Sequence, residues 1–167
     1  MPYKGSYAWK VRQKAGDMRL LMPCTDTICV NEKGEILMIY NRDFDGWAFP
    51  GGSVEYGQTW AEAAAQETLE EGGLVVQPKD LIPFGSISGN SYVFQYQDGS
   101  SQVFGQLFIA HKFTQSETPL DQEEISEAKW FSLEAAEKLK KTLSGKLIFP
   151  AYKKWLQTKE FQQIIAQ

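Results

Sequence analysis

Apolar and β-branched residues cluster in two short segments near the start of the chain, and these segments predict β-strands. They cover residues 25–30 and 35–40, and residues 31–34 between them have the composition of a turn. The pattern therefore predicts a β-hairpin. After a polar loop, a short apolar strand at residues 47–50 runs directly into a double glycine, which lets the backbone approach a ligand closely.

A helix is predicted beyond this glycine pair, because hydrophobic positions recur there at helical spacing. Thr59 followed by Glu62 fits a capping box, in which a hydroxyl and a carboxylate each satisfy a free backbone donor. Gly72 and Gly73 supply the left-handed exit that helices commonly use. The positions expected to face the core are Trp60, Ala61, Ala64, Ala65, Thr68 and Leu69.

The middle of the chain predicts further strands. Residues 75–76 and 81–88 favour strands, and residues 91–96 and 102–113 form a second hairpin around an Asp-Gly turn. The chain alternates in this way between strands and turns up to residue 113. A polar loop follows.

The last part of the chain predicts two helical segments. Ser132 caps the first, which covers residues 133–143 and ends at residues 144–145. Pro150 opens the second, whose apolar positions can continue as far as Ile165. Nothing in this tail indicates chemistry, and we expect it to pack across the sheet or against a partner subunit.

The order of these elements predicts a mixed sheet flanked by helices. The fold class is α/β (α+β), in the form of an α/β/α sandwich. We expect one domain at residues 21–143, with a basic N-terminal extension at residues 1–20. A helical tail at residues 144–167 packs on the same domain.

Composition and charge argue against several classes of function. The chain of 167 residues has a net charge of −4 and a pI near 5.1, which disfavours a protein held to nucleic acid by phosphate contacts. No apolar run approaches the ~20 residues that span a membrane, and no secretory signal precedes Met22. We therefore expect a cytoplasmic protein whose two cysteines, Cys24 and Cys29, are reduced core residues.

The first twenty residues differ in charge from the rest. Five lysines and arginines against one aspartate give this segment a net charge of +4, and aromatic residues lie between the charges. Two interpretations stay open: an edge strand or extension lying over the domain, or a basic aromatic lid or dimer arm near a phosphate site. The second interpretation makes a homodimer one of the partners to consider.

Three glutamates gather on one face of the predicted helix. Glu67, Glu70 and Glu71 fall at positions i, i+3 and i+4, so their like charges repel by about 0.2–0.5 kcal/mol per pair. A hard divalent cation would offset this repulsion, because Mg²⁺ takes oxygen ligands and shares them with substrate phosphates. A solvated acidic face is the alternative for an arbitrary triple of glutamates.

With the upstream glycines included, this stretch resembles the signature of Nudix hydrolases. That signature is a glycine, five residues, Glu, seven residues, Arg-Glu, a hydrophobic residue, any residue, Glu-Glu, any residue, glycine and a hydrophobic residue. The positions that match are Gly52, Glu67, Glu70, Glu71, Gly73 and Leu74. The resemblance extends over about residues 20–143 and implies a Nudix-type α/β/α sandwich.

Three positions depart from the signature. Gln58 stands where the family has its first Glu, Gln66 where it has Arg, and Thr68 where it has a hydrophobic residue. In the family that Glu and Arg are thought to pair and tie the loop to the helix. Two amides can hydrogen-bond to each other, and replacing both partners of an ion pair need not be costly. We therefore interpret Gln58 and Gln66 as a neutral substitute for the pair.

The resemblance implies a site for Mg²⁺ or Mn²⁺. The three glutamates of the helix, Glu67, Glu70 and Glu71, would be metal ligands, joined by a backbone carbonyl of Gly51 or Gly52. Glu70 or Glu71 would also be the candidate that takes a proton from the attacking water. The resemblance thus gives these carboxylates both metal-binding and catalytic roles.

The acidic loop before residue 125 offers one more carboxylate. In related chains such a loop often reaches the metal or supplies the base, and Glu123 and Glu124 are the candidates here. The sequence does not separate them, and we take Glu124 forward as catalytic residue and metal ligand. A solvated acidic loop is the alternative.

Substrate contacts are predicted from the loop and strands around the signature. Arg42 could bind a phosphate, and Tyr92 or Phe94 could stack on a base, although a surface arginine and core aromatics are the alternatives. The resemblance implies hydrolysis of a nucleoside diphosphate linked to another moiety, such as ADP-ribose or a nucleotide sugar. The alternatives are hydrolysis of nucleoside triphosphates, or a catalytically silent nucleotide-sensing module.

Overall fold

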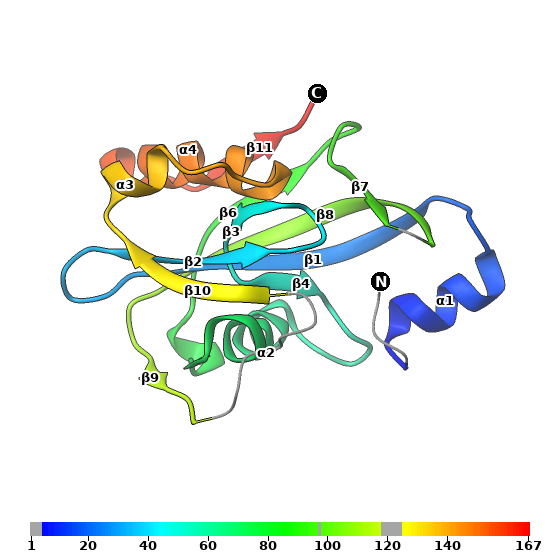
Figure 1. Cartoon of the computed structure of the whole chain (residues 1–167), viewed down its shortest axis with the longest axis horizontal. Coiled ribbons are helices and arrows are strands. Elements are labelled where there is room, and N and C mark those ends of the chain that lie inside the picture. Colours follow the sequence, from blue (N-terminus) through cyan, green and yellow to red (C-terminus); the bar gives the residue numbers. More distant parts are fainter. Residues whose placement is uncertain (1–4, 97, 118–124) are drawn as a thin grey trace.

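A computed structural model describes residues 5–96, 98–117 and 125–167, and it places two main sheets between helices (Figure 1). The larger sheet runs in the order β11-β6-β8-β1-β4, with β7 paired to β8. Its strands are β1 (Leu20–Cys29), β4 (Gly51–Ser53), β6 (Ile82–Ser88), β7 (Val93–Tyr96), β8 (Gly99–Ala110) and β11 (Gln162–Ile165). Pairs β1–β8 and β11–β6 are parallel and the others antiparallel, so the sheet is mixed as predicted.

The smaller sheet contains the second strand of the predicted first hairpin. It has the order β10-β2-β3, with β2 (Ile36–Asn41), β3 (Gly46–Ala48) and β10 (Ile125–Phe131). The hairpin prediction is wrong beyond its turn, because β1 and β2 are joined only by an isolated bridge in the described residues. Both edges of β1 are occupied by β8 and β4, so β2 pairs elsewhere. A third, two-stranded sheet joins β5 (Leu74–Val75) to β9 (Thr114–Gln115).

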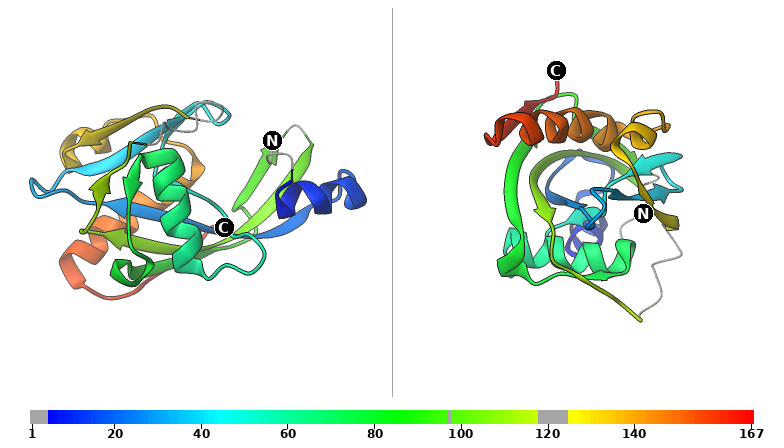
Figure 2. Two further views of the ribbon diagram at one scale, coloured as in Figure 1. Left: turned by 90° about the horizontal axis from the view of Figure 1, so that it is seen from below. Right: turned by 90° about the vertical axis from the view of Figure 1, so that its left-hand side faces the viewer.

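Helices cover the two outer faces, which confirms the predicted sandwich. α2 (Trp60–Gly72) lies on one side, with the 3-10 turn η1 (Pro78–Asp80) after it, and α3 (Leu133–Glu137) and α4 (Leu143–Thr158) lie on the other (Figure 2, right). One apolar core fills the space between the sheets and under α4, and a second lies under α2. None of the helices in the described part of the chain is long and apolar enough to cross a membrane.

The buried face of α2 matches the prediction only in part, because Ala61, Ala65 and Leu69 are half-buried. Ala64 and Thr68 are fully buried as expected, but Trp60 is 40% exposed and Ala63 is buried in its place. Trp60 is the first residue of the helix, where the chain has only begun to approach the sheet. The Thr68 hydroxyl donates to the Ala64 carbonyl at 2.7 Å, which satisfies a polar group that would otherwise be costly in the core.

The C-terminal segments also differ from the prediction. Ser132 caps α3 as expected, but α3 ends at Glu137 and residues 144–145 belong to the first turn of α4. Thr142 caps that helix, accepting from the Gly145 N–H at 3.2 Å, and Pro150 lies inside it. The apolar tail beyond it is the strand β11 and not a helix, because it pairs with the open edge of β6.

The N-terminal segment contains a helix, α1 (Tyr7–Ala15), so the edge-strand interpretation is wrong, while a lid or dimer arm stays a prediction. Ser6 caps α1, and its hydroxyl accepts from the Trp9 N–H at 3.1 Å. α1 lies beside the tip of the β7–β8 hairpin, at the end of the molecule away from α3 (Figure 2, left).

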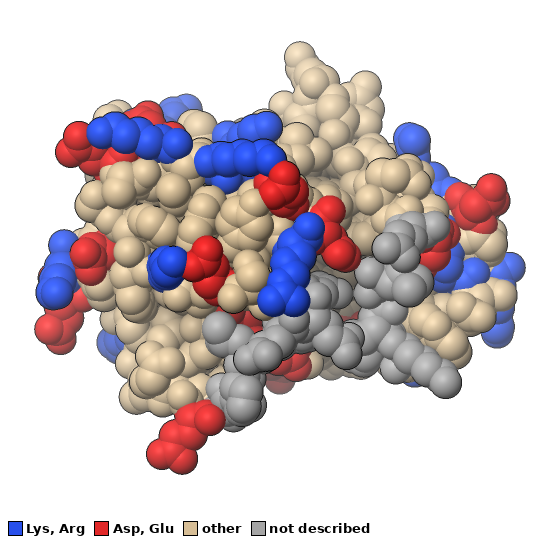
Figure 3. All heavy atoms as spheres, viewed as in Figure 1, with Lys and Arg blue, Asp and Glu red and all other residues tan. Residues whose placement is uncertain are grey.

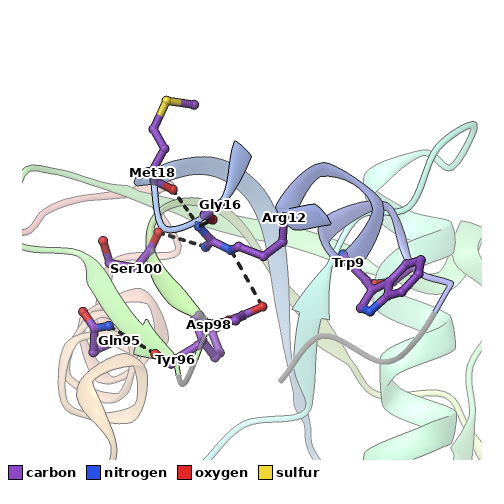
Figure 4. Close-up of polar contacts among 9 residues, drawn as sticks. Trp9, Arg12, Gly16, Met18, Gln95, Tyr96, Asp98 and Ser100 are labelled. Carbon is purple, nitrogen blue, oxygen red and sulfur yellow. Dashed lines mark hydrogen bonds and ion pairs between the residues drawn. The ribbon is translucent and has the colours of Figure 1, made fainter. Parts of the chain in front are cut away.

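Arg12 fastens α1 to this hairpin (Figure 4). The side chain is buried, and its guanidinium reaches the Gly16 carbonyl (3.0 Å), the Met18 carbonyl (2.6 Å), the Ser100 carbonyl (3.2 Å) and the Asp98 carboxylate (3.7 Å). Hydrogen bonds from a charged donor contribute about 1.5–3 kcal/mol each. Arg12 is therefore a structural clamp, with most of its donors directed at the protein itself.

Charges of both signs are interspersed on the face drawn in Figure 3. The ammonium of Lys138, the C-cap of α3, approaches Glu134 at 3.5 Å, and Lys153 of α4 pairs with Glu137 at 2.8 Å. Exposed pairs of this kind contribute about 0–1 kcal/mol each. The pattern on this face is mixed, although the chain as a whole is acidic.

Candidate active site

The turn before α2 fixes where this helix begins. The Thr59 hydroxyl accepts from the Glu62 N–H at 3.3 Å, and the Glu62 carboxylate accepts from the Thr59 N–H at 2.8 Å. The predicted capping box is therefore confirmed. At the other end Gly73 is left-handed, with φ of 66°, and its N–H donates to the Leu69 carbonyl. Both ends of the helix are satisfied, which orients its acidic face.

A chain of amide hydrogen bonds ties the preceding loop to α2. Gln58 accepts from the Glu55 N–H at 2.9 Å, and its own amide donates to Gln66 at 2.6 Å. Gln66 in turn donates to the Glu70 carboxylate at 2.8 Å. The expected hydrogen bond between the two glutamines is present, and its role as the substitute for an ion pair stays a prediction.

The double glycine forms a cradle for two of the three carboxylates. The Gly51 N–H donates to the Glu71 carboxylate at 2.8 Å. A Cβ atom added to Gly52 would overlap the Glu67 carboxylate, so this position has no room for a side chain. Glu71 is only 5% exposed. We refer to Gly51 and Gly52 as the glycine turn. This turn and α2 together hold Glu67 and Glu71 against the backbone of β4.

The arrangement in this state is not a preassembled metal site. Within residues 5–96, 98–117 and 125–167, no three Asp, Glu, His or Cys side chains are grouped closely enough to hold an ion. Glu70 turns toward Gln66, while Glu71 turns toward Gly51. The side chains gathered here nevertheless offer carboxylate oxygens, which hard divalent cations prefer. The residues fit such an ion if Glu70 leaves its contact with Gln66.

Two adjoining cavities meet at the glycine turn. The larger, about 220 Å³, extends from α2 toward α1, and the smaller, about 80 Å³, lies between the two main sheets. Gly51, Gly52 and Glu71 line both of them, whereas Glu67 and Glu70 line the larger alone. The acidic face of α2 therefore borders a cavity that has room on either side of the turn.

The N-terminal helix forms one wall of the larger cavity. Ser6, Ala8 and Arg12 line it together with residues of α2. The Tyr7 N–H donates to both oxygens of the Glu55 carboxylate, at 2.8 and 3.1 Å. The segment expected to lie over the domain thus borders the cavity that holds the acidic residues.

The predicted substrate-binding residues lie in three different places. Arg42 is exposed in the turn between β2 and β3, where its neighbours Asn41 and Phe44 line the cavities and Arg42 does not. Tyr92 is 2% exposed and belongs to the core, where burial raises the pKa of its phenol well above the usual range. Phe94 is half-buried and lines the smaller cavity. Glu123 and Glu124 lie outside the described residues.

Two aromatic contacts that the sequence analysis missed close the smaller cavity. Phe44 packs edge-on against Phe94 and Tyr96, with ring centroids 5.2 and 5.6 Å apart. These rings join the β2–β3 turn to the β7 strand, which are far apart in the sequence. The two hairpins give no signal of this contact in the sequence, because it depends on how the sheets face each other.

Asp26 also lines the site and was not predicted as a site residue, although the sequence did contain a signal for it. It is the single charged residue of β1, and its side chain is 8% exposed in the smaller cavity. Burial raises the pKa of its carboxyl to about 7, because a low-dielectric environment disfavours the charged form. On the same strand, burial raises the pKa of the Cys24 thiol to about 12.

Comparisons with known proteins give consistent matches. A model of the NUDIX domain family matches residues 21–152. A putative 8-oxo-dGTP diphosphatase of Bacillus subtilis is 31% identical over 108 residues, which is 63% of this chain and 62% of that relative. The match therefore spans less than two thirds of the relative's length.

Solved structures show the same fold. The MutT protein of Bacillus halodurans aligns with a TM-score of 0.60 and 22% identity, over 77% of this chain and 80% of that one. The NUDIX domain of Shewanella oneidensis NrtR, complexed with ADP ribose, aligns with a TM-score of 0.63 and 16% identity, over 86% of this chain and 92% of that one. At such identities these likenesses concern the fold alone.

Proposed function

Since the chain belongs to the NUDIX domain family, we propose that it is a metal-dependent hydrolase of phosphoric anhydrides. The substrate we propose is a nucleoside diphosphate linked to another moiety, such as ADP-ribose or a nucleotide sugar. The observation that carries this proposal is the position of the acidic helix face at the junction of two cavities. A diphosphate at the junction would leave one cavity for each of the two groups that it joins.

The ion would be Mg²⁺ or Mn²⁺, held by the three glutamates of α2 and a carbonyl of the glycine turn. When bound, such an ion neutralises phosphate charge and makes a nearby water more acidic. Glu124 remains the proposed additional ligand or base from the acidic loop. The oxygen-only donor set and the overlap that a side chain at Gly52 would cause both support this assignment.

Other groups of the chain would position the metal-binding carboxylates and deprotonate the attacking water. The Gly51 N–H keeps Glu71 at the turn, and the Gln58–Gln66 hydrogen bond keeps the loop against the helix. Glu70 is the exposed member of the acidic triad, so it could turn toward a water after leaving Gln66, and Glu70 or Glu71 would take the proton. A general base of this kind contributes about 10²–10⁴-fold to a rate.

A nucleoside triphosphate is the second candidate substrate. The relative in Bacillus subtilis is named a putative 8-oxo-dGTP diphosphatase, and a triphosphate would also place an anhydride bond beside α2. For a triphosphate, the larger cavity would hold only the leaving phosphates.

We further propose a cytoplasmic location, supported by two free cysteines that would stay reduced there.

The test is hydrolysis of a nucleotide panel with and without Mg²⁺, with products separated by chromatography. Glu70→Gln and Glu71→Gln should lower kcat at least about 10²-fold, while Glu134→Gln, the same change on the exposed face of α3, should not. Cleavage of a nucleoside diphosphate derivative into two phosphorylated products would support the first candidate. Binding without turnover on every nucleotide would contradict the proposal and favour a sensing module.

A further inference from the structure

Asp26 occupies a place where a strand normally carries an apolar side chain. It lies opposite Gly51 in the β1–β4 pair, between Thr25 and Thr27, which are both buried. The neighbouring positions on its own face of the strand are Cys24 and Ile28. Asp26 therefore places a carboxylate in the wall of the smaller cavity.

No described residue compensates this carboxylate. Across residues 5–96, 98–117 and 125–167, none forms an ion pair or a side-chain hydrogen bond with it, in contrast to Glu71, which accepts from the Gly51 N–H. Burial, and to a smaller extent the charge of Asp26, raises the pKa of the Tyr92 phenol and of the Cys24 thiol, and neither group is a cation. Burying a carboxylate without partners is costly, so a ligand that supplies donors would remove the cost.

Aromatic residues line part of the cavity around Asp26. Phe94 and Tyr96 come from β7, and Phe44 comes from the facing β2–β3 turn. Aromatic side chains stack on nucleobases in proteins that bind single-stranded nucleic acids. The cavity begins at the glycine turn, which is where the diphosphate would lie. It thus offers aromatic surfaces, with the Asp26 carboxylate in one wall and Glu71 at the glycine turn.

The chemistry of a carboxylate selects among the bases. Its two oxygens only accept hydrogen bonds when it is ionised, so it matches an edge that presents two adjacent N–H donors. Guanine presents N1–H and the 2-amino group side by side. Adenine presents one donor beside an acceptor nitrogen, which would face a carboxylate oxygen and be repelled.

We infer that Asp26 is a specificity-determining residue that binds the N1–H and 2-amino donors of a guanine base in the smaller cavity. The inference rests on the proposed function, because it places the nucleoside half of the substrate on this side of the glycine turn. It deepens that proposal by naming the base. The larger cavity would select the other moiety of the substrate, and the inference about the base does not depend on that selection.

The experiment compares guanine and adenine nucleotides on the wild-type protein and on Asp26→Asn. An asparagine at this position keeps one acceptor and gains one donor, so it suits the adenine edge. Binding of GMP and AMP is measured by calorimetry at about pH 8, and kcat/KM is measured for GDP-glucose and ADP-glucose with Mg²⁺. Asp17→Asn, the same change at an exposed site, is the control.

A bidentate contact to a base discriminates by roughly 10- to 100-fold. We expect the wild type and Asp17→Asn to prefer the guanine ligand by about this factor, and Asp26→Asn to lose or reverse that preference while it still binds AMP. Equal affinity of the wild type for GMP and AMP, or weak binding of both, would overturn the inference. If Asp26→Asn lost affinity for GMP and AMP to the same extent, the inference would also be overturned, because such a loss indicates a structural role for Asp26.

The binding arm separates this inference from the proposed hydrolysis. Guanine-selective binding that depends on Asp26, without turnover of any nucleotide, would support the inference and contradict the enzyme. Turnover with no base preference would do the reverse.

Discussion

Replacing Asp26 by asparagine should change how the stability of the protein depends on pH. Burial raises the pKa of this carboxyl from 3.8 to about 7 in the folded protein. Between these values the folded state keeps a proton that the unfolded chain has lost. The unfolded state therefore binds fewer protons, and the free energy of unfolding falls as pH rises through this window.

The size of the effect follows from the shift. Each pKa unit corresponds to about 1.4 kcal/mol, so a shift of about three units costs about 4 kcal/mol once pH exceeds 7. About 2–3 kcal/mol of this loss falls between pH ~5 and pH ~8, because part of the cost is already present at the lower value. Asp26→Asn has no carboxyl to ionise and should not show this loss.

The assay is urea unfolding of both proteins at pH ~5 and pH ~8, in EDTA so that no metal contributes. Other titrating groups are common to the two proteins and cancel in the difference. We expect Asp26→Asn to gain about 2–3 kcal/mol relative to the wild type on going to the higher pH. A difference between the two proteins that stays constant with pH would refute the argument that burial disfavours the ionised carboxyl.

Three further outcomes are expected. Thr59→Ala removes the N-cap of α2 and should lower the free energy of unfolding by about 1 kcal/mol in urea titrations; no change would show that the cap does not stabilise the fold. The Cys29 thiol should react with a thiol reagent at pH ~8 only after unfolding, because the residue is fully buried and burial raises its pKa to about 12; rapid labelling of this thiol in the native protein would contradict this. Gly89→Ala should destabilise the protein by about 3 kcal/mol, since φ is 136° and the added Cβ would overlap the Ala166 backbone; thermal unfolding at an unchanged temperature would be inconsistent with that overlap.

The parts of the site that could be predicted from sequence are those set by residues close together in the chain. The capping box of Thr59 and Glu62 spans three residues, and the Gln58–Gln66 hydrogen bond spans eight. The turn at the N-cap, together with the geometry of the helix that follows, brings these residues together. The contact of Glu71 with Gly51 spans twenty residues, and only the resemblance to Nudix hydrolases placed these two residues in one site.

The parts that sequence did not predict depend on long-range pairing. Asp26 lines a cavity only because β1 pairs with β8, about eighty residues later, and with β4. The contact between Phe44 and Tyr96 depends on how the two sheets face each other. Long-range pairing also explains why the predicted first hairpin does not form: β2 pairs with β3 and β10 instead of with β1.

The assignment of α2 as the metal-binding element is tested most directly by a crystal structure with Mn²⁺ and a non-hydrolysable nucleoside diphosphate derivative. The account predicts anomalous density for at least one ion, contacted by Glu67, Glu71 and a carbonyl of the glycine turn, with Glu70 released from Gln66. The diphosphate would lie on the ion, between the two cavities. Density for the nucleotide with no ion near α2, and with the three carboxylates in solvent, would contradict the account.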